Sequence, residues 1–72
     1  MEEKIVEILR QVMEDQSVNA DSSQANCEKW DSMAQLNIVV ELEDAFGVNL
    51  EPEQIEGMKS VSDIVKVISS LK

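Results

Sequence analysis

The segment KWDSMAQLNIVVELEDAFGV, residues 29–48, decides the fold of this 72-residue chain. Asp and Ser are preferred where a helix begins because their oxygens accept free backbone N–H groups, so Asp31 and Ser32 predict a helix start. Apolar side chains recur at 3-4 spacing after this pair, and Gly47 is a natural left-handed terminator. The segment therefore predicts a helix that begins at Asp31 or Ser32 and ends at Phe46.

Two further segments flank this helix on its N-terminal side. Residues 2–15 have apolar side chains at helical spacing and predict an amphipathic helix. Residues 16–30 have no sustained periodicity and predict a long loop, a kind of connection that is often functional. The expected anchors of this loop in the core are Val18, Ala25 and Trp30. We interpret Trp30 as an anchor, with an apolar contact to the first helical turn, in preference to a direct contact with cargo or a partner.

The C-terminal part of the chain predicts one short helix and one longer helix. Pro52 suits a first helical position and Gly57 suits a helix end. Ser60 and Asp63 have the spacing of a capping box, which predicts the start of a last helix. One face of that helix is expected to carry Val61, Ile64, Val65, Ile68 and Leu71.

Length and composition favour one small helical domain. A chain of 72 residues predicts a single domain, residues 1–72, with little room for a substrate cleft. Hydrophobic residues make up 43% of it, and it has only two Gly and one Pro, which suits helices. We therefore predict an all-α four-helix bundle with a long first loop and a short third helix. This size favours a carrier or adaptor over a self-contained enzyme.

The charge balance is strongly acidic, with 15 Asp and Glu against 6 Lys and Arg. Nucleic acid and anionic membranes would be repelled, whereas a partner with a basic surface would be attracted. The alternative is that acidity serves only solubility.

Cys27 is the single cysteine, no apolar run has membrane-spanning length, and the N-terminus lacks a secretion signal. We expect a cytoplasmic monomer.

Several kinds of catalytic and metal site are excluded. The chain has no His, so Ser-His and Cys-His pairs and imidazole metal ligands are absent. A calcium loop beginning at Asp44 fails because Phe46 and Val48 stand where oxygen ligands are needed. Two of the carboxylates of Glu41, Glu43 and Asp44 could form a catalytic pair, but a solvated helix face is the favoured interpretation. We predict no catalytic residue and no resident metal.

Ser32 has two interpretations that its residue type leaves open. One cap is enough for a helix, so either Asp31 or Ser32 can cap while the other remains free. A free hydroxyl at a helix N-terminus is well placed to bear a phosphodiester, because the dipole and unpaired N–H groups favour an anion there. The alternative is an unmodified acidic adaptor in which Ser32 is only a cap.

The segment DSMAQLNIVVELEDAFGVNL, residues 31–50, resembles the Asp-Ser-Leu, helix and acidic-acidic-x-Phe pattern of acyl carrier proteins, within the wider family of phosphopantetheine carrier domains. The order of helices over nearly the whole chain is also similar. Departures are Lys29 where Gly is usual, Met33 for Leu, and Ala34 and Asn37 for acidic residues. The Trp-Asp-Ser opening resembles specialised stand-alone carriers found beside dedicated biosynthetic enzymes.

The resemblance implies a role for each residue of the Asp-Ser pair. Ser32 would carry 4′-phosphopantetheine, transferred from coenzyme A by a phosphopantetheinyl transferase with Mg²⁺. Asp31 would help to position the metal and the pyrophosphate during loading. The arm's thiol would hold an acyl group as a thioester for fatty acid or polyketide biosynthesis. The close alternative is a carrier of aminoacyl or hydroxyacyl units in the same fold.

The resemblance also implies a partner surface and an acyl pocket. The helix of residues 31–46 would be recognised by acyl-transferring or condensing enzymes with basic docking surfaces. Its expected contact residues are Met33, Asn37, Val40, Glu41 and Asp44. An acyl chain would lie between the second helix and the last two, among Val39, Leu42, Phe46, Met58, Ile64 and Ile68. Ile64 stands where a smaller residue is common in fatty-acid carriers, which predicts that the interior accepts only a short or branched acyl chain, or none.

Overall fold

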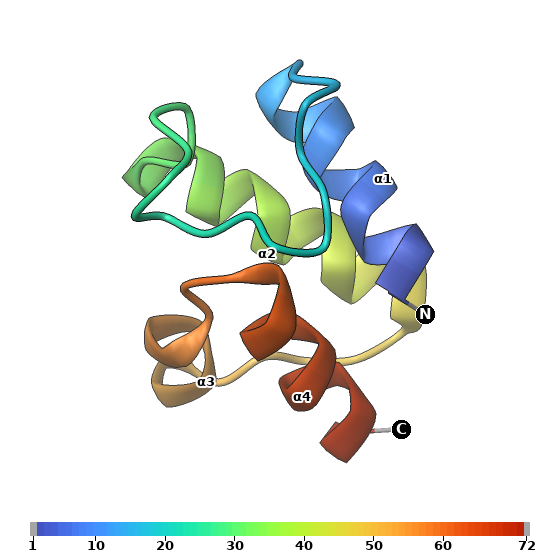
Figure 1. Cartoon of the computed structure of the whole chain (residues 1–72). Coiled ribbons are helices and arrows are strands. Elements are labelled where there is room, and N and C mark those ends of the chain that lie inside the picture. The colour runs from blue at the N-terminus through green and yellow to red at the C-terminus, as the bar shows by residue number, and fades with distance from the viewer. Residues whose placement is uncertain (1, 72) are drawn as a thin grey trace.

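The computed structural model describes residues 2–71, and these residues form four helices (Figure 1). They are α1 (Glu2–Met13), α2 (Ser32–Phe46), α3 (Pro52–Gly57) and α4 (Val61–Leu71). The closest helix packing is that of α1 with α2 and with α4. The only β-type pairing within residues 2–71 is an isolated bridge between Ser23 and Ser60. The predicted all-α architecture, with a long first loop and a short third helix, is confirmed.

The core is mainly aliphatic and receives side chains from all three longer helices. Apolar residues four apart on a helix lie on one face, so each helix presents a pair of them inward. Burying such a side chain contributes roughly 1.5–3 kcal/mol, which is how short helices become stable together. The largest fully buried side chains include Ile5 and Leu9 of α1, Ile38 and Leu42 of α2, Ile64 and Ile68 of α4, and Met58.

Helix α1 ends at Met13, two residues before the predicted end. Glu14 has a positive φ of 51°, and the N–H of Asp15 donates to the carbonyl of Arg10 at 3.1 Å. The carboxylate of Asp15 then accepts the hydroxyl of Ser17 at 2.5 Å and its N–H at 2.9 Å. These hydrogen bonds, the hydroxyl first, hold the pKa of Asp15 below its ordinary value. A left-handed residue therefore terminates α1.

Replacing Glu14 with glycine should stabilise the fold by about 0.5–1 kcal/mol. A left-handed backbone costs an ordinary L-residue about 1–2 kcal/mol, and glycine's greater freedom when unfolded offsets part of the gain. Urea unfolding would measure the change as a higher midpoint at an unchanged slope. Glu7→Gly, in the exposed middle of α1, is the matched control and should destabilise. If both variants destabilise equally, the left-handed terminator is not what ends α1.

The first loop is anchored by two of the three predicted residues. Val18 and Trp30 are buried and belong to the core, as predicted. Ala25 is exposed, so its prediction as an anchor was wrong. A single methyl group offers little area to bury, and the half-buried Cys27 packs against the core in that part of the loop.

Backbone hydrogen bonds between the first loop and the start of α4 supply the rest of the anchoring. The carbonyl of Ser22 accepts the N–H of Val61 at 3.0 Å, and the N–H of Gln24 donates to the carbonyl of Lys59 at 2.9 Å. Ser22 is itself buried. A loop lying against a core must satisfy its backbone polar groups, and this short pairing does so.

Helix α4 begins at the predicted cap. The hydroxyl of Ser60 accepts the N–H of Asp63 at 3.1 Å, but the Asp63 carboxylate accepts the N–H of Lys59 at 3.3 Å instead of that of Ser60. The capping box is therefore only half formed. Ile64 and the other central residues face inward, but Leu71 is 38% exposed. Its prediction as an inward residue was wrong, because it is the last residue of α4.

Candidate functional site

Asp31 caps helix α2 and leaves Ser32 free. Asp31 has extended backbone angles, and its Oδ1 accepts the N–H of Ala34 at 2.9 Å. Ser32 is the first helical residue and is exposed. Its hydroxyl makes no hydrogen bond with any residue in the range 2–71. The prediction that one residue of the pair caps while the other remains free is confirmed.

The start of α2 has the chemistry that an anion on Ser32 needs. The first N–H groups of a helix have no partner one turn back, and only the third of them, that of Ala34, is taken by the cap. The positive end of the helix dipole lies at the same place. The surroundings of the Ser32 hydroxyl therefore fit a phosphodiester group.

A surface depression of about 410 Å³ lies beside Ser32. Its lining combines an exposed apolar side chain, that of Leu36, with polar groups from the first loop and from α2. This mixture suits a flexible chain that is partly apolar and partly amide-like. The lining residues are Gln24, Trp30, Asp31, Ser32, Gln35 and Leu36.

Trp30 joins the first loop to α2 through a hydrogen bond. Trp30 belongs to the same buried cluster as Ala34 of the first helical turn, while a direct apolar contact with that turn stays a prediction. The indole Nε1–H donates to Gln35 Oε1 at 2.7 Å. The side-chain Nε2 of Gln35 donates in turn to the carbonyls of Ile55 at 3.0 Å and Met58 at 3.1 Å. Gln35, which was not among the predicted site residues, thus connects the loop, α2 and the end of α3.

The exposed side of α2 carries an apolar patch bordered by polar residues. Met33 is 70% exposed and Val40 is 61% exposed. Leu36, which sequence reasoning left out of the site, is 62% exposed and lies in the same row. The regular spacing of these three residues was a signal that could have included it. The docking face is defined here as Met33, Leu36 and Val40 with the exposed residues Asn37, Glu41 and Asp44.

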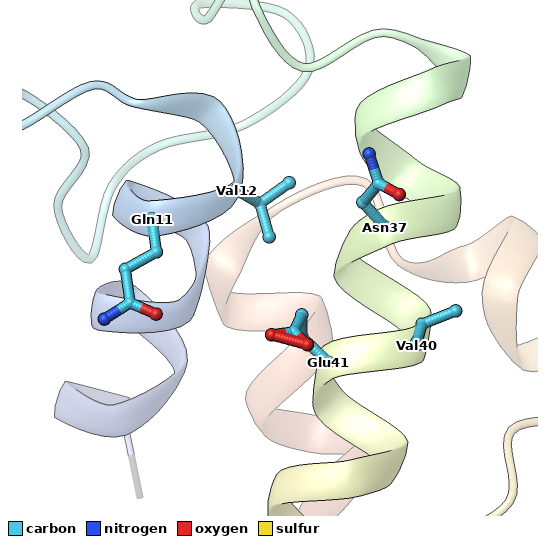
Figure 2. A pocket seen from close by; sticks show the side chains of 5 residues that line it. All are labelled: Gln11, Val12, Asn37, Val40 and Glu41. Carbon is cyan, nitrogen blue, oxygen red and sulfur yellow. The ribbon is translucent and has the colours of Figure 1, made fainter.

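A groove of about 260 Å³ continues the docking face toward α1 (Figure 2). Figure 2 shows Val12 of α1 facing Asn37 and Glu41 of α2 across this groove. Gln11 and Val40 complete its lining. The Asn37 and Glu41 side chains make no hydrogen bond with any other residue that the structure describes. They are therefore available to a partner.

Glu43 differs from its acidic neighbours on α2. Its side chain is half-buried, and its Oε2 accepts the N–H of Leu50 at 2.8 Å. Its backbone carbonyl also accepts the N–H of Gly47, which has a left-handed φ of 64°. Glu43 therefore shapes the connection between α2 and α3 instead of belonging to a solvated face.

The six predicted acyl-pocket residues converge in the core. Leu42, Met58, Ile64 and Ile68 are fully buried, and Val39 is 7% exposed. Phe46 is half-buried and packs against the same cluster. The structure thus brings these residues together between α2, α3 and α4, while a role in holding an acyl chain stays a prediction.

Two general properties of the described residues bear on the class of protein. Within residues 2–71, no helix is both long enough and apolar enough to cross a membrane. In the same range, no three His, Cys, Asp or Glu side chains are grouped so that they could hold a metal ion. Cytoplasmic location and a monomeric state stay predictions.

Comparison with known proteins identifies the family. The family described as "Phosphopantetheine attachment site" matches residues 3–68. An acyl carrier protein of Rhodococcus erythropolis is 31% identical over 77 aligned positions, covering 99% of this chain and 85% of that protein. A meromycolate extension acyl carrier protein of Mycobacterium leprae is 30% identical and covers 94% of this chain, which spans 61% of that protein.

Solved structures agree on the fold. The structure of the holo acyl carrier protein of Geobacter metallireducens superposes with a TM-score of 0.85 at 24% identity, covering 97% of this chain and 83% of that one. A family match over most of the chain and a relative of similar length agree with the free serine at the mouth of α2. The chain therefore belongs to the phosphopantetheine attachment family and is an acyl carrier protein, which holds acyl intermediates on a 4′-phosphopantetheine group.

Proposed function

We propose that Ser32 is the attachment residue. Its hydroxyl oxygen loses its proton and forms the phosphodiester to 4′-phosphopantetheine, while the pyrophosphate bond of coenzyme A breaks and 3′,5′-adenosine diphosphate leaves. The observation that carries this assignment is the free, exposed hydroxyl at the first position of α2, beside a cap that Asp31 already supplies. The dipole of α2 and the unpaired N–H groups at its start favour the negative charge of the phosphodiester. The adjoining depression offers space for the first part of the arm.

The protein's own contribution is attachment, tethering and recognition. When bound, the prosthetic group supplies the thiol that holds acyl cargo as a thioester. Tethering keeps that cargo at a high effective concentration near a docked enzyme. The phosphopantetheinyl transferase attaches the arm, and chemistry on the cargo then belongs to acyl-transferring or condensing enzymes.

Intact mass tests the attachment site directly. The protein is incubated with coenzyme A, Mg²⁺ and a promiscuous phosphopantetheinyl transferase, and fragmentation then locates the modification. One phosphopantetheine on Ser32 is the expected result. No added mass with several transferases would contradict the carrier function at this residue and favour an unmodified acidic adaptor. Trapping the acyl form from cells would separate acyl from aminoacyl or hydroxyacyl cargo.

Partner enzymes dock on the docking face through a basic surface. The face combines three exposed apolar side chains with two carboxylates, on a chain with a net charge of −9. The apolar residues supply contact area, and the carboxylates act mainly on the rate of encounter. The α1–α2 groove, with Glu41 on one side, extends the same surface.

Charge reversal on the docking face should slow loading by the transferase. Glu41→Lys is expected to lower kcat/KM roughly three- to tenfold at low ionic strength, because it replaces attraction with repulsion at encounter. The effect should shrink at high salt, where surface charges are screened. Glu56→Lys makes the same charge change on the exposed surface of α3. An equal loss in both variants would show that net charge acts, without a defined face.

A further inference from the structure

Helix α3 lacks strong anchors of its own. It has six residues, Pro52–Gly57, and none of them is buried. Its Ile55 is half-buried, and the buried Leu50 and Met58 lie just outside its two ends. A short helix held mainly at its flanks depends on additional contacts for its position.

One side chain supplies such contacts from α2. Both N–H groups of the Gln35 amide are used, toward the carbonyls of Ile55 and Met58, and its oxygen accepts the indole N–H of Trp30. Gln35 is half-buried, so these hydrogen bonds are less exposed to competition from water. The Gln35 latch is defined as Gln35, Trp30 and the carbonyls of Ile55 and Met58.

The latch lies between the attachment residue and the core. Gln35 is one turn after Ser32, and the two line the same depression. Behind the latch, Met58 packs into the core with Ile64. In Figure 1, α3 lies under the N-terminal half of α2, and the hydrogen bonds of Gln35 join the two helices there.

We propose that the Gln35 latch closes the gap between α2 and α3 to an acyl chain carried on Ser32, which makes Gln35 a specificity-determining residue. This inference rests on the proposed function. An aliphatic chain entering the core must part Gln35 from the two carbonyls and leave three buried or half-buried polar groups to find other partners. The cargo therefore stays outside the core, where a partner enzyme reaches the thioester directly.

The substitution Gln35→Glu distinguishes the hydrogen bond with Trp30 from the two hydrogen bonds to α3. Gln35→Glu keeps an oxygen that can accept from Trp30, but it loses both donors to α3 and places a negative charge against two carbonyls. Gln24→Glu is the matched control, because Gln24 lines the same depression without taking part in the latch. Both variants are tested alone and together with Ile64→Ala, which makes room in the core.

The readout is the rate at which hydroxylamine cleaves an octanoyl thioester, divided by the rate for an acetyl thioester on the same variant. A thioester whose acyl chain lies inside the core is protected from hydroxylamine, and one whose acyl chain lies outside is not. The unmutated protein should cleave both at similar rates. Gln35→Glu alone should slow octanoyl cleavage severalfold relative to the unmutated protein. The double variant Gln35→Glu with Ile64→Ala should cleave the octanoyl thioester roughly tenfold more slowly than Ile64→Ala alone, as expected for two lost hydrogen bonds. Gln24→Glu should change neither ratio.

Two results would overturn the latch. One is octanoyl protection that is already complete in the unmutated protein, and the other is an unchanged ratio for Gln35→Glu in both backgrounds. Amide exchange at Ile55 and Met58 in the unloaded protein gives a separate readout and should be faster in Gln35→Glu. If Ser32 accepts no arm, the mass measurement contradicts the proposed function. The latch is then tested by amide exchange alone, and an unchanged exchange rate at Ile55 and Met58 in Gln35→Glu would overturn it.

Discussion

Ser32→Ala should abolish the gain of one phosphopantetheine that the unmutated protein shows by intact mass. No other residue combines a free, exposed hydroxyl with the N-terminal end of α2, so no substitute acceptor is expected. The fold should survive, because the cap hydrogen bond comes from Asp31 and alanine is a good first residue in a helix. Circular dichroism on the variant would confirm that loss of loading is not loss of folding.

Controls for this prediction come from the other nucleophilic side chains of the first loop. Ser23→Ala and Cys27→Ala should load as fast as the unmutated protein. An added mass on Ser22, Ser23 or Cys27, or full loading of Ser32→Ala, would show that the attachment residue is wrong.

Asp31 allows its two suggested roles to be separated. Asn caps a helix about as well as Asp, so Asp31→Asn should leave the melting temperature nearly unchanged. Loss of the carboxylate should nevertheless slow loading roughly 10- to 100-fold, the range seen for residues that orient metal ligands. Asp31→Ala should lose the cap as well, at about 0.5–2 kcal/mol. Equal loading rates for Asp31→Asn and the unmutated protein would leave Asp31 with the capping role alone.

Local signals made α2 and α3 predictable. Asp31, Gly47 and Pro52 each have a backbone requirement that acts at their own position, and the helices begin and end where these residues stand. The end of α1 was mispredicted because Glu14, unlike glycine or asparagine, gives no sign of a left-handed conformation. Ala25 failed as a loop anchor because backbone pairing with the start of α4, which has no side-chain pattern, anchors that part of the loop.

The candidate site also contains residues that local sequence signals reveal and one residue that they do not. The helix-start position of Ser32 and the spacing of the side chains along α2 are local properties, while the attachment role and the partner contacts came from the resemblance to acyl carrier proteins. Gln35 could not be predicted, because its hydrogen bonds reach carbonyls 20 and 23 residues further along the chain. Such contacts depend on how α2 and α3 approach each other, and any polar residue on α2 has the same appearance in the sequence. This is why the latch emerged only from the fold.

The unmutated protein should gain little stability from a long acyl chain, with octanoyl and acetyl forms melting within about 2 °C of each other. Ile64 is fully buried and packs in one cluster with Leu42, Met58 and Ile68. Forcing a chain into this core would demand repacking that costs roughly 1–3 kcal/mol, which offsets what the chain gains by burial. In a domain of this size that amount is a large share of the total stability.

In Ile64→Ala the gain from burying the acyl chain should exceed the cost of repacking, because the chain then fills the cavity that the smaller side chain leaves. The substitution alone should destabilise the acetyl form by about 2–5 kcal/mol. The octanoyl form should regain part of that loss and melt several degrees above the acetyl form, since about 1 kcal/mol shifts the melting temperature by 4–8 °C in a small domain. If Ile64→Ala does not fold, Ile64→Val, which costs about 0.5–1.5 kcal/mol, should show a smaller difference of the same sign.

Val67→Ala is the control, since Val67 is a half-buried residue of α4 outside the predicted pocket. It should lower both melting temperatures without separating them. A clear rise in melting temperature with octanoyl in the unmutated protein would contradict the prediction. It would mean that flexible side chains such as Met58 move aside at little cost, so that neither Ile64 nor the latch limits the length of the cargo.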